Sequence, residues 1–303
     1  MSNVISKYRN GNYTVTLFED GTKIRMNNLD NLTPSFPESI DISITTKCDG
    51  GCSFCYLNCG LEGKHADLNQ KFFDTLPSGI ELALNGNDLS HPELFSFLEK
   101  MKKKNIICNL TVNQKHFIKH FNTLRSLSDN KLIRGLGISL NDSSEKEFYS
   151  YLKYFPNAVI HTIDGLLTEK DLNNLSDKNI KLLILGFKQL GRGDMYYEKN
   201  KDSINSNISW LKDNLNFYRN KFSVISFDNL ALEHLNVQSM IPKTEWEMNY
   251  MGDEGSYTMY VDAVNKRYAV SSLEKTQYEL SDSIYEMFAH IRKETGKEIY
   301  TGE

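Results

Sequence analysis

The feature of this sequence that most constrains its fold is an alternation of short apolar runs with longer segments of helical spacing. Seven runs of strand length occur at residues 40–44, 80–84, 106–112, 136–140, 158–163, 180–185 and 222–227. Segments with helical spacing between them include 92–103, 115–127, 144–154, 169–175 and 202–218. Strands that alternate with helices imply βαβ crossovers and a parallel sheet covered by helices. The pattern therefore predicts an α/β fold, with a full or partial (β/α) barrel as its natural closure.

Two further patterns flank this region. Residues 13–26 alternate around an Asp-Gly pair, which is a strong hairpin signal. Residues 257–270 resemble a second hairpin, and 283–292 have the spacing of an amphipathic helix. We therefore predict three parts, which are an N-terminal β-hairpin (1–36), a barrel (37–230) and a C-terminal extension of hairpin and helix (231–303).

Composition narrows the functional classes. Hydrophobic residues make up 40% and charged residues 24% of the 303 residues, as in ordinary globular proteins. The formal net charge of -4 is small and gives no clear signal for nucleic-acid binding. No stretch approaches eighteen uninterrupted apolar residues, and the N-terminus lacks an apolar signal core. We therefore expect a cytoplasmic protein that does not associate with membranes.

Four of the five cysteines fall within the twelve residues from Cys48 to Cys59, and Cys108 stands alone. Such clustering, without a signal peptide, favours metal binding over a disulfide framework. Cys48, Cys52 and Cys55 are separated by three and then two residues, so one short loop can wrap a small inorganic cluster. In a cluster of four irons each thiolate binds one iron, so three thiolates leave the fourth iron with an open position for another ligand.

The spacing Cys-x3-Cys-x2-Cys after a first strand, with an aromatic residue before the last cysteine, resembles the signature of the radical S-adenosylmethionine (SAM) superfamily. The resemblance implies a partial (β/α)6-type barrel with a [4Fe-4S] cluster on Cys48, Cys52 and Cys55. It also implies SAM bound at the open iron, with Phe54 against the adenine. An electron donor such as flavodoxin or ferredoxin would drive cleavage of SAM to a 5'-deoxyadenosyl radical, which abstracts a hydrogen atom from a substrate.

Polar residues that follow the later strands are candidate SAM contacts. The second strand precedes Gly86 and Asn87, where the family usually carries Gly-Gly-Glu-Pro; Gly86 is retained, but Asn87 stands where a Glu contacts the SAM amino group. An Asn carbonyl accepts a hydrogen bond from an ammonium without the charge assistance of a carboxylate. A plain Asn- and Gly-rich turn is the alternative. Asn113, Ser139 and Asn141 end the third and fourth strands, where they would contact SAM or only cap helices.

Lys188, Arg192 and Cys59 are candidates for contact with the substrate. Lys188 and Arg192 lie in a Gly-Arg-Gly turn after the sixth strand, which is similar to a loop of peptide-modifying radical SAM enzymes. They would hold a carboxylate of substrate or SAM, or form ordinary surface salt bridges. Cys59 would donate a hydrogen atom to a substrate radical, or simply be packed.

The resemblance therefore implies a radical SAM enzyme that acts on a peptide or amino-acid-like molecule. The C-terminal hairpin supports this substrate class, because it is similar to one that opens the auxiliary-cluster extension of peptide-maturing relatives. No cysteine follows Cys108, which excludes a second cysteine-bound cluster. A small metabolite or nucleoside is the alternative substrate. A non-catalytic zinc or iron-sulfur protein that also uses Cys59 is the alternative from another class, since four thiols suit tetrahedral zinc.

Overall fold

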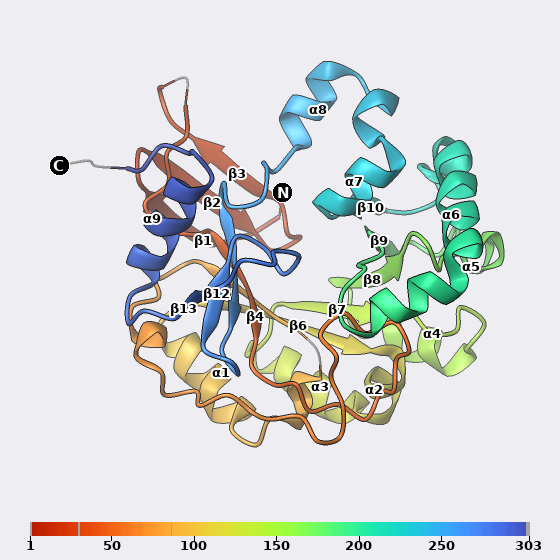
Figure 1. Ribbon diagram of the computed structural model, residues 1–303, viewed down its shortest axis with the longest axis horizontal. Helices are drawn as coiled ribbons and strands as arrows, with labels where there is room; N and C mark the ends of the chain where they lie inside the picture. The colour runs from red at the N-terminus through yellow and green to blue at the C-terminus, as the bar shows by residue number, and fades with distance from the viewer. Residues whose placement is uncertain (1, 30, 86, 301–303) are drawn as a thin grey trace.

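The computed structural model describes residues 2–29, 31–85 and 87–300, and its main feature is a ten-stranded, mostly parallel sheet (Figure 1). Seven consecutive strands of this sheet run parallel in chain order. They are β4 (Ser39–Ser43), β5 (Glu81–Leu84), β6 (Ile107–Asn113), β7 (Gly135–Ser139), β8 (Ala158–Ile163), β9 (Lys181–Leu185) and β10 (Val224–Phe227). Each corresponds to a predicted apolar run, and the predicted α/β fold is confirmed. Together with β11 (Thr258–Asp262), which pairs in parallel with β4, the parallel strands of the described chain number eight, where a (β/α)6-type barrel has six.

Helices follow most of the parallel strands. They are α1 (Leu94–Lys103), α2 (Gln114–Lys119), α3 (Phe121–Asp129), α4 (Lys146–Leu152), α5 (Glu169–Leu175), α6 (Arg192–Tyr218) and α7 (Asn229–Leu235). Helix α6 begins ten residues earlier than its apolar spacing indicates. Its first turns are mostly polar, and Asn200 leaves helical geometry and kinks the helix, which hides the early part from a periodicity argument. Helix α7 and the later α8 (Lys243–Asn249) were not predicted at all.

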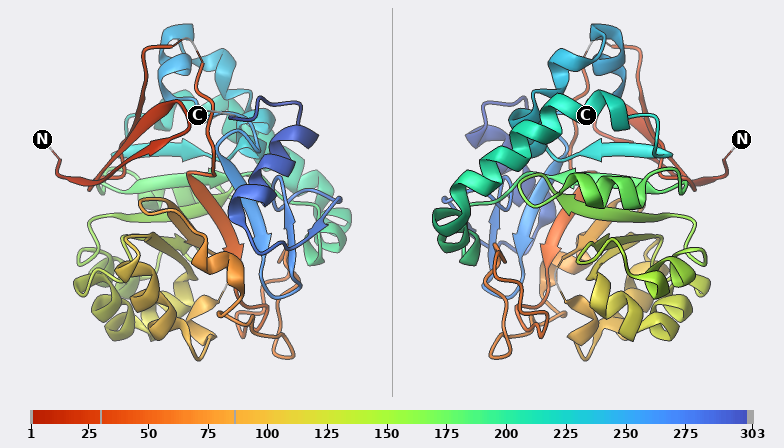
Figure 2. Two further views of the ribbon diagram at one scale, coloured as in Figure 1. Left: turned by 90° about the vertical axis from the view of Figure 1, so that its left-hand side faces the viewer. Right: turned by 90° about the vertical axis from the view of Figure 1, so that its right-hand side faces the viewer.

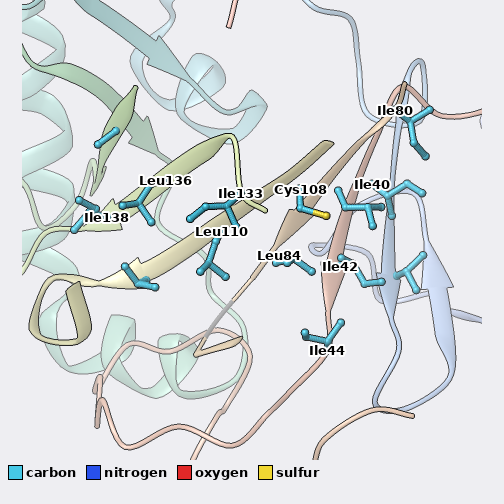
Figure 3. Close-up of a cluster of buried hydrophobic side chains, with 14 of the residues drawn as sticks. Ile40, Ile42, Ile44, Ile80, Leu84, Cys108, Leu110, Ile133, Leu136 and Ile138 are labelled. Carbon is cyan, nitrogen blue, oxygen red and sulfur yellow. The ribbon is translucent and has the colours of Figure 1, made fainter. Parts of the chain in front are cut away.

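The parallel strands bury one face completely and leave the other partly open. In β4, Ile40 and Ile42 have no exposed surface, whereas Asp41 between them is exposed. Figure 3 shows the buried face, where Cys108 lies beside Ile40 and Leu84 lies between Ile42 and Leu110. Because successive side chains of a strand point to opposite faces, Asp41 marks the open face of β4. Cys108 belongs to the core, as its alternation predicts.

The sheet curves strongly. The loops that follow β4 and β9 meet, since the backbone N–H of Arg192 donates to the Cys55 carbonyl at 3.1 Å. Five inter-strand steps separate these two strands, and a flat sheet would keep them about 24 Å apart. The open face is therefore the concave one. Within the described residues β10 and β13 remain unpaired edges, so hydrogen bonding does not close the sheet into a barrel.

A separate three-stranded sheet covers the amino ends of the parallel strands. It consists of β1 (Val4–Asn10), β2 (Tyr13–Phe18) and β3 (Lys23–Met26), and the predicted hairpin is its second half. Lys23 pairs with Glu81 at the start of β5 at 2.7 Å, and Lys181 at the start of β9 donates to the Asp20 carbonyl at 3.2 Å. Figure 2 shows this sheet at the opposite end of β4 from the loop that follows that strand.

The C-terminal segment extends the main sheet instead of standing apart from it. Strand β11 (Thr258–Asp262) pairs in parallel with β4, and β12 (Arg267–Ala269) and β13 (Tyr278–Glu279) follow in antiparallel order. Helix α9 (Ile284–Glu294) then packs into the core. The predicted hairpin and helix are both present, while the division at residues 36 and 230 stays a prediction. Within the described part of the chain, no helix is long and apolar enough to cross a bilayer.

Candidate functional site

The cysteines lie on a loop that follows β4 and closes on itself. We call residues 48–60 the cysteine loop. Its base is fixed by the Cys48 N–H, which donates to the Gly60 carbonyl at 2.9 Å, and by the Gly60 N–H, which donates to the Thr46 carbonyl at 3.0 Å. Cys48, Cys52 and Cys55 are each partly exposed free thiols. The fold therefore presents three thiols at the carboxyl edge of the sheet, where βα-loops carry function in related architectures.

Gly50 keeps space between two of these thiols. A Cβ atom at this position would lie 3.2 Å from the Cys48 sulfur and 3.9 Å from the Cys52 sulfur. The Gly50 N–H also donates to the Cys48 sulfur at 3.3 Å. A side chain here would thus fill the hollow that the two sulfur atoms border.

Cys59 lies near the end of the cysteine loop, close to Cys55. It is buried, whereas the three other loop cysteines are partly exposed. Its thiol points to the Leu57 carbonyl at 4.0 Å, and its closeness to Cys55, with the backbone N–H groups of Cys59 and Leu57, outweighs burial and lowers the pKa of Cys55 to about 6. The same contact, together with burial, raises the pKa of Cys59 above its ordinary value. Cys59 is thus packed close to a neighbouring thiol, and its predicted role as a hydrogen donor stays a prediction.

Within the described chain, no three His, Cys, Asp or Glu side chains converge on a point where a single metal ion would bind. A [4Fe-4S] cluster makes a different demand, because each thiolate binds a separate iron. Three partly exposed thiols on one loop, with an unfilled space at Gly50, suit that demand. The donor set therefore fits such a cluster.

The predicted SAM contacts surround the cysteine loop to different degrees. Asn113 caps α2, and its side-chain amide lies 3.8 Å from the Cys52 sulfur. Phe54 packs edge-on against Tyr196 of α6, with ring centroids 5.8 Å apart. Ser139 is half-buried at the end of β7, whereas Asn141 is exposed beyond it. Gly86 lies outside the described residues.

Asn87 points toward the cysteine loop. It is buried, and its amide donates to Asp49 Oδ1 at 3.4 Å. The same oxygen contacts Nε2 of His116, a buried residue of α2, at 2.7 Å, and Lys119 lies 3.6 Å from the other oxygen. The hydrogen bond from His116 lowers the pKa of the Asp49 carboxyl, so it is ionised near neutral pH. Sequence reasoning missed Asp49 and His116, because only the fold brings them together.

Lys188 and Arg192 diverge, although four residues separate them. Arg192 donates to the Cys52 carbonyl at 3.0 Å and to Asn58 Oδ1 at 3.1 Å, so its guanidinium is engaged with the cysteine loop. Lys188 instead lies 4.3 Å from the centroid of the Tyr56 ring and donates to Ser272 at 3.0 Å. The structure places only Lys188 among other charged side chains.

We call Asp41, Lys188, Asp228 and Glu254 the charged wall. Burial, combined with the nearby Asp41 carboxylate, raises the pKa of Glu254 to about 7. Burial raises the pKa of Asp228, and the protein around the concave face withdraws water from Asp41 and raises its pKa although its side chain reaches solvent; Lys188 opposes both shifts. Within the described residues, Lys188 has no carboxylate within 4.0 Å. The charged groups of the wall therefore change one another's pKa values, although no ion pair within 4.0 Å joins them among the described residues.

Two residues in the sequence point to the open face: Asp41 to the charged wall, and Gly137 to His161. Asp41 interrupts an apolar run, which places a carboxyl group on the open face of a central strand. His161 lies on the same concave side in β8, and burial lowers its pKa to about 4, so it is neutral at physiological pH. A Cβ at Gly137 would lie 2.4 Å from this imidazole, which explains why a glycine occupies the facing position in β7.

Comparisons with known proteins give one kind of match. No protein-family profile and no curated protein sequence matches the chain. Among solved structures, the fold resembles that of SuiB from Streptococcus suis, which was crystallised with the precursor peptide SuiA. The TM-score is 0.55, the sequence identity is 14%, and the match covers 82% of this chain and 63% of SuiB. The likeness is one of fold, and this chain matches less than two thirds of the length of that protein.

Proposed function

We propose that this chain is a radical SAM enzyme that binds a [4Fe-4S] cluster through Cys48, Cys52 and Cys55. The observation that carries the proposal is the cysteine loop itself. It presents three free thiols in the superfamily's spacing around Gly50, at the carboxyl edge of a curved α/β sheet. We further propose that the curved sheet is a partial barrel of the radical SAM type.

When bound, the cluster would supply the electron that cleaves SAM to a 5'-deoxyadenosyl radical. The chain's own residues would position and shield this chemistry. Asn113 would hold Cys52 through its amide, and Phe54 with Tyr196 would supply an aromatic surface for the adenine. Ser139 and Asn141 would add polar contacts from the end of β7. A flavodoxin or ferredoxin would be the physiological electron donor.

We propose a peptide or amino-acid-like substrate. SuiB, whose fold this chain shares, was crystallised with a precursor peptide. The charged wall suits such a substrate, because peptides carry amide, ammonium and carboxylate groups that its carboxylates and Lys188 would bind. Tyr56, which follows the last cluster ligand directly, links the wall to the cysteine loop through its contact with Lys188. A small metabolite or nucleoside is the alternative substrate.

One observation favours a second candidate function. Cys59 contacts Cys55, so a fourth thiol lies beside the three cluster ligands. Four thiolates suit a structural zinc site in a non-catalytic protein. In that case Cys59→Ala would abolish metal binding, whereas the radical SAM proposal predicts that this variant keeps its cluster.

The deciding experiment is anaerobic reconstitution with iron and sulfide, followed by dithionite, SAM and chromatography for 5'-deoxyadenosine. We expect about four irons per chain, as a [4Fe-4S] cluster requires, and deoxyadenosine that Cys52→Ala abolishes and Cys59→Ala retains. Stimulation by candidate peptides but not by nucleosides would support the substrate class, and the reverse would overturn it. Zinc in place of iron, or a cluster that never cleaves SAM, would overturn the enzyme proposal.

A further inference from the structure

Arg192 holds the cysteine loop from the side of β9. Its guanidinium Nε donates to the Cys52 carbonyl at 3.0 Å, and Nη1 donates to Asn58 Oδ1 at 3.1 Å. Its backbone N–H donates to the Cys55 carbonyl at 3.1 Å. One residue at the start of α6 therefore contacts the loop at three points, two of them the carbonyl groups of proposed cluster ligands.

Glycines on both sides allow this approach. Gly191 has φ of +56°, and a Cβ there would lie only 2.5 Å from the Tyr56 carbonyl oxygen. A Cβ at Gly193 would lie 2.3 Å from the Lys188 carbonyl oxygen and 3.3 Å from that of Phe54. Any other residue at either position would push α6 away from the loop. The Gly-Arg-Gly sequence is thus shaped for contact with the cysteine loop, not for an open surface turn.

The opposite side of the loop is held as well. Asp49, between the first two cysteines, contacts His116 at 2.7 Å, and Asn87 donates to the same carboxylate oxygen at 3.4 Å. These two partners come from α2 and from the segment that follows β5. The cysteine loop is therefore pinned between the β5–β6 side of the sheet and the β9 side.

We infer that Arg192 is a positioning residue that sets the spacing of the Cys48, Cys52 and Cys55 thiols before any metal binds. The inference rests on the proposed cluster site, and it assigns the Gly-Arg-Gly turn a role different from anchoring a substrate carboxylate. The planar fork of an arginine fixes two acceptors at once, which a lysine does not do. Groups that orient metal ligands typically change metal affinity about 10- to 100-fold when they are removed.

The first test uses the metal-free protein, so it does not depend on the identity of the metal. Alkylation of Cys52 and Cys55 by iodoacetamide would be followed by mass spectrometry in the wild type, Arg192→Gln and Arg192→Lys. We expect Arg192→Lys to react several-fold faster, because it keeps the positive charge that favours the reactive thiolates while the loop opens when the fork is lost. In Arg192→Gln the loss of that charge slows the reaction and offsets part of the gain. Arg219→Gln, at the other end of the same helix, is the matched control and should react like the wild type. A wild-type rate in Arg192→Lys would overturn the inference.

A gentler variant guards against a folding defect. Asn58 has φ of +53°, so Asn58→Gly removes the side-chain acceptor and keeps the left-handed backbone accessible. Arg192 then retains its bond to the Cys52 carbonyl, and we expect an intermediate alkylation rate at an unchanged melting temperature. An alkylation rate equal to that of the wild type would contradict the positioning role of Arg192.

The second test concerns the reconstituted protein and separates the two proposals. Iron bound per chain at limiting iron should correspond to an affinity about ten-fold weaker in Arg192→Gln. The electron paramagnetic resonance signal of its reduced cluster should also shift or broaden, which a general loss of stability would not cause. If the wild type assembles no cluster while the alkylation rates differ as expected, the proposed function fails and the positioning role of Arg192 stands. If the wild type assembles a cluster that Arg192→Gln matches in every readout, the positioning role of Arg192 fails and the proposed radical SAM function stands.

Discussion

Two carboxyl groups at β4, one just before the strand and one on its concave face, lie in opposite surroundings. Glu38, immediately before the strand, is fully buried, accepts from Tyr13 at 2.6 Å and from Arg25 at 2.8 Å, and pairs with Lys23 at 3.5 Å. Asp41, three residues later, is exposed on the concave face and makes no ion pair within 4.0 Å among the described residues. The carboxylate at the amino end of the strand is held by ion pairs, whereas the one on the concave face is not.

This contrast separates structural charge from charge available to a ligand. The buried group around Glu38 fastens the N-terminal sheet to the amino end of the parallel strands. In the charged wall, withdrawal of water by the surrounding protein raises the pKa values of Asp41, Asp228 and Glu254, and no ion pair within 4.0 Å among the described residues offsets it. Charges held at such a disadvantage are typical of functional sites, where stability is lost for the sake of binding.

The largest effect is expected at the amino end. Glu38→Gln keeps the size of the side chain but leaves Arg25 buried without its carboxylate. Removing one partner of a buried ion pair destabilises a protein by about 3–5 kcal/mol, so the free energy of unfolding should fall by about 3 kcal/mol. Urea denaturation measures it. A loss below about 1 kcal/mol would show that this cluster is not the fastening that the contacts indicate.

A change of opposite sign is expected for Glu254→Gln. Folding raises the pKa of Glu254 from its ordinary value of 4.5 to about 7, so between these pH values the folded protein binds more protons than the unfolded chain. Stability therefore falls as pH rises through this interval, and Asp41 and Asp228 act in the same direction while Lys188 opposes them. The glutamine variant should be more stable than the wild type at pH 7.5, by on the order of 2 kcal/mol after allowance for partial exposure.

The pH dependence is the control for that variant. At pH 5.0 the Glu254 carboxyl is mostly protonated when folded, so the difference between variant and wild type should shrink. Denaturation curves at both pH values decide the matter. A difference that is equal at pH 5.0 and pH 7.5 would mean that packing, and not charge, accounts for the gain.

The smallest effect is expected for Asp41→Asn. This is the same acid-to-amide change as at Glu38, made three residues further along the chain. The protein around the concave face withdraws water from this carboxylate, and this effect outweighs the attraction of Lys188. The free energy of unfolding at pH 7.5 should therefore rise, by at most about 1 kcal/mol because the side chain still reaches solvent. Substrate-stimulated deoxyadenosine formation should fall in the same variant. A destabilisation as large as that of Glu38→Gln would show that Asp41 stabilises the fold as Glu38 does.

Local patterns anticipated most of the secondary structure. The seven apolar runs are strands, and both hairpins turn where their sequences indicate. Strand β1 was missed, since its residues alternate only weakly, with buried side chains at Ser6 and Asn10. The early part of α6 was missed because its turns are polar and it packs through Gly193 and the loop instead of an apolar stripe. Periodicity detects burial on one face, and these segments are held by other means.

The sequence by itself determined which thiols share a loop and which strands alternate with helices, because both depend on neighbours along the chain. Only the tertiary structure decided that β11 lies beside β4, that Asn87 faces Asp49, and that Arg192 and Lys188 serve different surroundings. These relations join segments from 38 to 219 residues apart, as in the pairs Asn87 with Asp49 and Ser39 with Thr258. They exist because the sheet curves until the loops of distant strands meet, and curvature is a property of the packed sheet that no local spacing records.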